Sequence, residues 1–191
     1  MYLKLNQLLV FIIIILLSAC SQFVIPDVDL IAENYPTKFK IPDDEIYSIK
    51  TRTSVNDMNF IVIVNQSSEW TGMKKKSDEF MTESLHKMGF KKVLSENELK
   101  QLIYKHGLHK NVIDIYSHKS LRRIYEKLGS FLLMVAEFGS EGKGKVKIKI
   151  YDPETDEPVF KLNTSAFVFS YDDQVLYPCV NAINDWYKAS Q

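Results

Sequence analysis

A glycine-rich segment at residues 139–145 has the spacing of a phosphate-binding loop, with two glycines flanking four residues and a lysine directly after them. In such a loop the next residue supplies a Ser or Thr hydroxyl for Mg²⁺, and a helix then begins towards the phosphate. Here the next residue is Val146, and residues 145–151 alternate lysine with apolar side chains, as a strand does. The segment therefore predicts a hairpin loop, and no nucleotide is expected.

Two histidines, His106 and His109, lie three residues apart, a spacing that puts two imidazoles on one face of a helix, as in a metal site. Gly107 between them instead indicates the end of a helix, and no carboxylate pattern accompanies them. A pocket that joined His106 or His118 to a carboxylate such as Asp114 would be needed for a hydrolase. We therefore interpret these histidines as surface residues, and no metal is expected.

The chain has only two cysteines, Cys20 and Cys179. Cys179 falls on the apolar stripe of the last predicted helix, which favours a buried, unreactive thiol over a nucleophile. Cys20 belongs to an N-terminal export signal, so Cys179 has no cysteine to pair with. No intramolecular disulfide and no metal site with several cysteines is therefore expected. No catalytic residue and no cofactor is predicted anywhere in the chain.

The N-terminal segment is an export signal. Lys4 precedes an apolar run at residues 8–19, and small residues end that run. The run is shorter than the roughly 20 residues that cross a bilayer, so an uncleaved membrane helix is the weaker alternative. We predict a signal peptide at residues 1–19.

The end of this run, Leu17-Ser18-Ala19-Cys20, resembles the lipobox of bacterial lipoproteins. The resemblance implies cleavage before Cys20 and acyl chains such as palmitate on that residue. Ser21 stands where inner-membrane retention would place Asp, so the resemblance implies anchoring in the outer membrane with the domain facing the periplasm. Two or three acyl chains hold a protein firmly, whereas one chain binds only marginally.

Composition limits the classes of partner. The chain of 191 residues carries 24 basic and 24 acidic residues, a balance that gives no electrostatic reason to expect nucleic acid. Three prolines and no helical or strand period predict an extended tether at residues 20–42, followed by a single domain at 43–191. The alternative is that Phe23-Val24-Ile25 and Leu30-Ile31 pack onto the domain.

Hydrophobic periodicity places the elements of that domain. Ser95 and Glu98 form a capping box, while Gly89 and Gly129 end helices. The predicted strands cover residues 45–50, 59–64, 90–94, 131–136, 145–151 and 159–169, and the predicted helices cover residues 73–88, 95–106, 117–128 and 177–187. This order predicts an α/β fold, an α+β sandwich with a mixed sheet of about five strands flanked by three to four helices.

Several local sequences, over about residues 58–165, resemble one superfamily of envelope domains: Phe60-Ile61-Val62-Ile63-Val64-Asn65, Val93-Leu94-Ser95-Glu96, and the hairpin from Val146 to Glu157. The superfamily includes the N-terminal domain of TolB, the curli secretion lipoprotein and lipoprotein activators of penicillin-binding proteins. Ser95-Glu96 replaces its usual Asp-Arg, and Asp156 replaces a hairpin glycine. No propeller and no membrane hairpins accompany the domain. The resemblance implies a membrane-tethered, protein-binding domain.

Exposed cations and aromatic residues are the remaining candidates for an interaction surface. Lys74, Lys75 and Lys76 open a predicted helix, where the helix dipole disfavours positive charge, and Trp70 precedes it. An anionic partner or a solvated helix face would each explain the lysines. Trp186-Tyr187 is either an interface anchor or a core contact.

These observations lead to three hypotheses of function. The first is a non-enzymatic lipoprotein of the cell envelope that binds another envelope protein as an adaptor. The second is a self-associating structural, secretion or assembly component of the envelope, and the third, weakest hypothesis is a hidden hydrolase.

Overall fold

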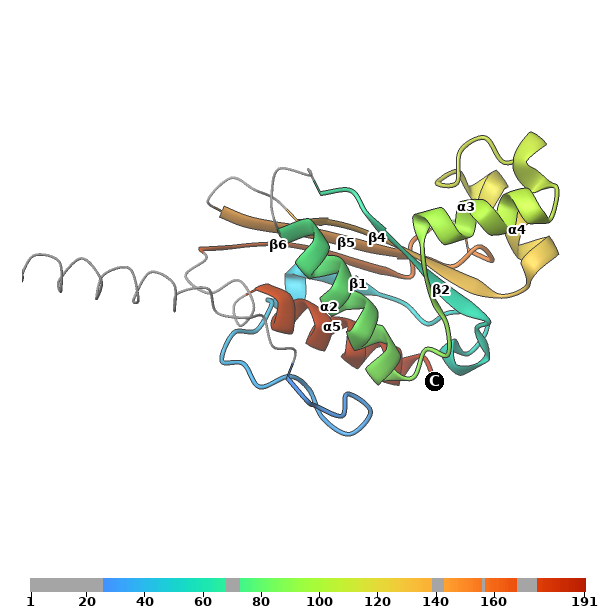
Figure 1. The fold of residues 1–191 in the computed structure, drawn as a ribbon. Coiled ribbons are helices and arrows are strands. Elements are labelled where there is room, and N and C mark those ends of the chain that lie inside the picture. The colour runs from blue at the N-terminus through green and yellow to red at the C-terminus, as the bar shows by residue number, and fades with distance from the viewer. Residues whose placement is uncertain (1–25, 68–72, 139–142, 156, 168–174) are drawn as a thin grey trace, which may run out of the picture.

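A six-stranded mixed sheet with helices on both faces forms the described part of the chain (Figure 1). The computed structural model describes residues 26–67, 73–138, 143–155, 157–167 and 175–191. The strands are β1 (Ile46–Ser48), β2 (Phe60–Asn65), β3 (Val93–Ser95), β4 (Phe131–Phe138), β5 (Lys143–Tyr151) and β6 (Phe160–Phe167), and the helices are α2 (Met73–Met88), α3 (Glu96–Lys105), α4 (His118–Leu128) and α5 (Tyr177–Ala189). The α/β fold class predicted from the sequence is confirmed. The sheet has six strands rather than about five, because all six predicted strand segments, including the short one at β1, pair into it.

The strand order β1-β6-β5-β4-β2-β3 places the continuous apolar strands β2 and β4 towards the middle of the sheet. β2 pairs in parallel with both β3 and β4, whereas β4, β5, β6 and β1 pair antiparallel. Strands buried on both faces read as near-continuous apolar runs, which explains the sequence of β2. The order leaves β1 and β3 as the two outer strands of the described sheet.

The two faces of the sheet are covered unequally. α2, α5 and residues 26–42 pack on one face, where Ile63, Met134 and Ile148 belong to the larger apolar core. α3 and α4 pack on the other face against β2, β3 and β4, where Val62 and Leu133 belong to a second core. Figure 1 shows α2 and α5 side by side, with α3 and α4 grouped at the far end of the sheet.

Several helices begin or end at the capping residues and glycines that the sequence predicts. The Ser95 hydroxyl accepts the Glu98 N–H at 3.3 Å, and the Glu98 carboxylate accepts the Ser95 N–H at 2.7 Å, which is the predicted capping box. Gly89 ends α2 with φ +108°, and the Phe90 N–H donates to the Leu85 carbonyl at 3.1 Å. This bond across the helix end needs a left-handed residue, which glycine adopts at no steric cost.

Residues 26–42 pack on the domain, so the extended tether predicted for residues 20–42 is wrong over this part. Leu30, Tyr35 and Ile41 are buried in the larger core. Asn184 donates to the Leu30 carbonyl at 2.8 Å, and Asn181 bonds the backbone of Tyr35. At Leu30 and Tyr35, α5 side chains rather than a regular ladder satisfy backbone groups, so the segment needs no helical or strand period there.

The alternative packing of this segment is confirmed at Leu30, whereas its neighbour Ile31 is exposed. Phe23-Val24-Ile25, the signal peptide at residues 1–19, Leu17-Ser18-Ala19-Cys20, Trp70 and the turn at 139–142 all lie outside the described residues. Among the helices that the structure describes, none combines the length and apolarity needed to cross a bilayer.

Candidate functional site

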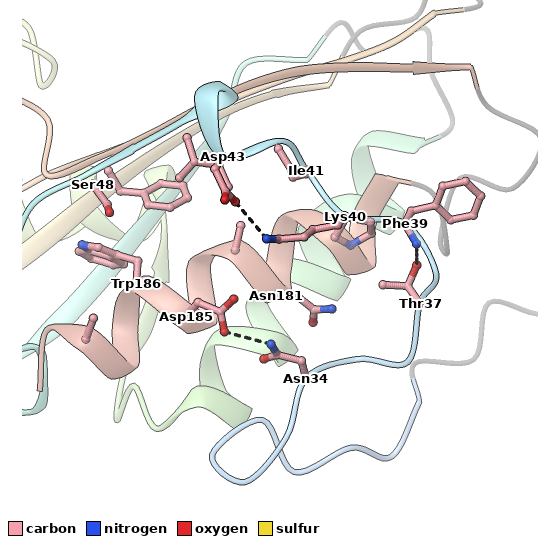
Figure 2. Close-up of a pocket in the computed structure, with 15 residues that line it drawn as sticks. Asn34, Thr37, Phe39, Lys40, Ile41, Asp43, Ser48, Asn181, Asp185 and Trp186 are labelled. Carbon is pink, nitrogen blue, oxygen red and sulfur yellow. Dashed lines mark hydrogen bonds and ion pairs between the residues drawn. The ribbon is translucent and has the colours of Figure 1, made fainter.

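A groove of about 630 Å³ lies between residues 34–43, the outer strand β1 and helix α5 (Figure 2). Phe160 and Trp186 form its apolar floor, and Ile46 and Ser48 of β1 line one side. Its size falls within the range of ligand-binding clefts, roughly 300–1,000 Å³. The groove therefore has room for several side chains of a bound molecule.

The floor of the groove is held in place by packing and one hydrogen bond. The Phe160 and Trp186 rings lie 5.7 Å apart between centroids, and both side chains are buried. The Trp186 indole N–H donates to the Ile49 carbonyl at 3.0 Å, which ties α5 to the end of β1. Trp186 is thus a core residue that also forms the groove floor, and the core alternative for Trp186-Tyr187 is confirmed because both are buried.

The rim of the groove is polar. The Asn34 amide donates to the Asp185 carboxylate at 3.0 Å, and Lys40 and Asp43 form an ion pair at 3.0 Å (Figure 2). Both partners of the ion pair are more than four-fifths exposed, so water screens the attraction. An arriving ligand can therefore compete for these charges at little cost.

The outer edge of β1, beside the groove, carries backbone groups that pair with no strand in the described part of the chain. The Ile49 N–H bonds inward to the Val159 carbonyl at 2.8 Å, so the antiparallel alternation turns the backbone groups of Ile46 and Ser48 outward. The Ile46 N–H is used by the Asp43 carbonyl, and no described strand pairs with the remaining groups. The edge therefore offers the Ile46 carbonyl and both backbone groups of Ser48.

Exposed apolar side chains surround this edge. Phe39 on the groove rim is 44% exposed, Tyr47 of β1 is 45% exposed, and Ile49 after β1 is 39% exposed. Single exposed apolar residues are ordinary, but three beside the outer edge of one strand form a surface suited to another chain. The arrangement can hold an extended peptide by backbone bonds and bury alternate side chains.

No local pattern in the sequence predicts this groove. Its walls come from residues 34–48, 160 and 178–189, which are distant along the chain and follow three different local patterns. Trp186 was the single groove residue that the sequence marked as a candidate anchor. The strand pairing of β1 with β6 and the side-chain bonds of α5 to Ile49 and Tyr35 bring the walls together.

The histidines and Asp114, which the sequence raised as candidates for a metal or hydrolase site, lie away from the groove. His106 caps the end of α3, His109 stacks on Tyr104 with centroids 4.8 Å apart, and Asp114 accepts the Tyr116 N–H at 2.8 Å in its own loop. His118 begins α4. Within the described residues, no three His, Cys, Asp or Glu side chains are placed to share a metal ion.

Cys179 is fully buried on α5, in agreement with the predicted apolar position. Burial raises the pKa of its thiol to about 12. A nucleophilic cysteine needs the opposite environment, because the thiolate is the reactive form. The side chain therefore acts as a small apolar group at neutral pH.

The lysines predicted as an interaction surface lie in the first turn of α2. Lys75 pairs with Glu79 at 3.7 Å, and both side chains are exposed. The Lys74 carbonyl accepts a bond from Asn65 at the end of β2. Trp70 is outside the described residues, so a joint surface of Trp70 with Lys74, Lys75 and Lys76 stays a prediction.

The sequence matches no protein-family model, and no curated protein matches it. Among solved structures, the chain is similar to the LpoB C-terminal domain from Salmonella enterica, with 12% identity over 62% of this chain and 88% of that chain and a TM-score of 0.42. It is similar to the PelC dodecamer from Paraburkholderia phytofirmans, with 9% identity over 76% of this chain and 98% of that chain and a TM-score of 0.42. It is also similar to lipoprotein GNA1162 from Neisseria meningitidis, with 17% identity over 69% of this chain and 97% of that chain and a TM-score of 0.37.

Proposed function

We propose that this chain is a lipid-anchored, non-enzymatic adaptor of the cell envelope that binds an extended segment of a partner protein along β1. The observation that carries this proposal is the outer edge of β1, with which no described strand pairs, directly beside a groove with an apolar floor. An extended peptide that joins a sheet edge gains backbone hydrogen bonds, and side-chain pockets then select its sequence.

The geometry of β1 defines how such a segment would lie. Its backbone would pair with the Ile46 carbonyl and with the N–H and carbonyl of Ser48. Because side chains alternate along a strand, one set would enter the groove above Phe160 and Trp186, and the other would meet Tyr47. A partner segment with apolar residues at alternate positions fits both surfaces.

The anchor is proposed from the sequence. Leu17-Ser18-Ala19-Cys20 supports cleavage and acylation at Cys20, and Ser21 supports sorting to the outer membrane with the domain in the periplasm. Acylation would keep the groove close to envelope proteins, which raises their effective concentration at the site.

The test is photo-crosslinking in living cells. Phe39 is replaced by a photoreactive phenylalanine analogue at the groove rim, and the matched control replaces Tyr104, which is 72% exposed on α3. We expect one envelope protein to be captured from position 39 and not from position 104. Equal capture from both positions, or capture of a second copy of this chain alone, would overturn the proposal.

Three variants and one control test the edge, the groove and the anchor separately. Ser48→Pro removes the outward N–H of β1, and Ala182→Phe fills the groove from α5 without touching the edge. Both should lower capture, whereas Ala32→Phe on the exposed loop should not. Cys20→Ala should release the protein from the membrane fraction, and its continued retention there would contradict the anchor.

A further inference from the structure

Four lysines project from the part of the sheet that α3 and α4 leave uncovered. Lys145, Lys147 and Lys149 of β5 are exposed, and Lys161 of β6 is partly exposed beside them. We call these four residues the lysine face. The residues that alternate with them along β5, Val146, Ile148 and Ile150, are buried in the larger core on the opposite face.

The pairing register places two of these lysines directly opposite each other. Lys149 pairs with Lys161 across β5 and β6. Like charges opposite one another on neighbouring strands destabilise a sheet. Lysines often protect the outer strand of a sheet from aggregation, but β5 lies between β4 and β6, so that reason does not apply here.

Acidic neighbours neutralise only part of the lysine face. Lys147 pairs with Glu137 at 3.2 Å, and Lys161 pairs with Glu157 at 3.2 Å. Among the described residues, neither Lys145 nor Lys149 has an ion-pair partner. The lysine face is therefore a local excess of positive charge on a chain whose formal net charge is zero.

The spacing of the lysines suggests the shape of an anionic partner. Alternate residues of a strand are about 6.8 Å apart, so three amines leave β5 in a regular row. An extended peptide with an acidic residue at every second position has the same repeat. Tyr47, whose ring lies 4.9 Å from the Lys161 amine, adds an aromatic surface at the end of the face.

From this match we infer that the lysine face binds an extended acidic segment of a partner protein, with Asp or Glu at alternate positions. This surface is separate from the groove, because side chains of adjacent β1 residues point to opposite faces of the sheet. The inference does not depend on the proposed use of the groove, and each can fail without the other.

The position of Pro26 argues against an anionic membrane as the occupant. The Pro26 carbonyl accepts a bond from Lys87 of α2 at 2.8 Å, so the chain enters the domain on the helical side (Figure 1). Pro26 lies six positions after the proposed anchor at Cys20, a stretch that spans at most about 20 Å. For the lysine face to lie on the membrane, this short stretch would have to pass around α2, which is about 10 Å wide, and then around the sheet.

The experiment is an NMR titration of the full-length acylated protein in neutral detergent micelles. The probe is an octapeptide of alternating Glu and Ser, and the control peptide has the same composition in two blocks. We expect amide shifts along β5 and β6 and binding about five- to tenfold tighter for the alternating peptide. Equal binding of the two peptides, or shifts elsewhere in the domain, would overturn the inference.

A pair of matched variants tests the residues. Lys145→Gln with Lys149→Gln should weaken the alternating peptide about five- to tenfold, because the two unpaired amines are lost. Lys105→Gln with Lys127→Gln removes the same charge from exposed helix positions and should change binding less than twofold. An equal loss in both, or tighter binding of the lysine face to phosphatidylglycerol vesicles than to the peptide, would refute an acidic protein segment.

Discussion

The side chain of Asn181 satisfies both backbone groups of Tyr35. Its carbonyl oxygen accepts the Tyr35 N–H at 2.8 Å, and its amide donates to the Tyr35 carbonyl at 3.0 Å. Asn181 thus does for this segment what a neighbouring strand does in a sheet. The Tyr35 hydroxyl continues the attachment, since it shares a hydrogen bond with Ser84 of α2 at 3.1 Å.

Replacing Asn181 should therefore loosen residues 26–42 from the domain. Asn181→Ala leaves a buried N–H and carbonyl without partners, and we expect a loss of about 2 kcal/mol in the free energy of unfolding. Urea denaturation followed by circular dichroism measures the change. Asn97→Ala, at an exposed position of α3, is the control and should shift stability by less than about 0.5 kcal/mol. Equal stability of the two variants would show that Asn181 does not hold this segment.

The capping box at the start of α3 should give a pH-dependent contribution to stability. Backbone and side-chain hydrogen bonds from Ser95 lower the pKa of the exposed Glu98 carboxyl below its ordinary value of 4.5. A carboxyl whose folded pKa is lowered stabilises the fold above its unfolded pKa, and that contribution is lost as pH falls through the folded pKa.

Ser95→Ala should cost about 1 kcal/mol at pH 7. The difference from the unmodified protein should shrink as the pH falls below about 4, because protonated Glu98 is a poorer acceptor. Thermal melts at several pH values give the comparison, and Ser165→Ala on the exposed side of β6 serves as control. A difference that stays constant down to pH 3 would contradict the role of the charged carboxylate.

Gly129 is the position at the end of α4 where a side chain cannot be placed. Its φ is +85°, and a Cβ atom would collide with the amide of Asn59. Gly129→Ala should lower the free energy of unfolding by about 2 kcal/mol, because the strain of a positive φ adds to the displacement of the Asn59 side chain. Gly107 also has positive φ but has open space around it, so Gly107→Ala should cost less. The order of the two midpoints in urea checks this prediction.

Cys179 should stay unreactive in the folded protein. Burial raises the pKa of its thiol from the ordinary 9.0 to about 12, so the thiolate is scarce at pH 8. A thiol reagent should modify Cys179 only in denaturant, when Cys20 is acylated or replaced. Because the unfolded thiol ionises first, stability should fall as pH rises above about 9, and Cys179→Ala should remove that part of the pH dependence. Rapid modification without denaturant would contradict the buried position.

Local signals in the sequence predicted most of the fold. Ser95 with Glu98, Gly89 and Gly129 act within one or two helical turns, so their patterns can be read without knowing the tertiary structure. The sequence of β2 is equally easy to assign, because a strand with both faces covered needs a continuous apolar run. The structure confirms each of these predictions.

Long-range contacts explain what the sequence did not predict. Tyr35 looks like part of a tether because its partner, Asn181, lies 146 positions later in the chain. The groove depends on the pairing of β1 with β6, which has no local pattern. The alternation in β5 predicted one wet face, but only the register shows that Lys149 meets Lys161.

That register leads to a last prediction, in which stability and binding change in opposite directions. Lys149→Glu replaces a like-charge pair with an attractive pair across β5 and β6, so the folded state should gain about 0.2–1 kcal/mol. The same change removes an amine from the lysine face and adds a negative charge, so the alternating acidic peptide should bind much more weakly.

Lys145→Glu separates the two effects. Lys145 pairs with Ser165, so this substitution loses peptide binding without gaining a cross-strand ion pair. Urea midpoints and the peptide titration, measured on both variants, give the comparison. A rise in stability at position 149 but not at 145, with binding lost at both, would mean that the unmodified chain keeps a destabilising charge pair for recognition. Unchanged binding in both variants would mean that the lysines serve only solubility.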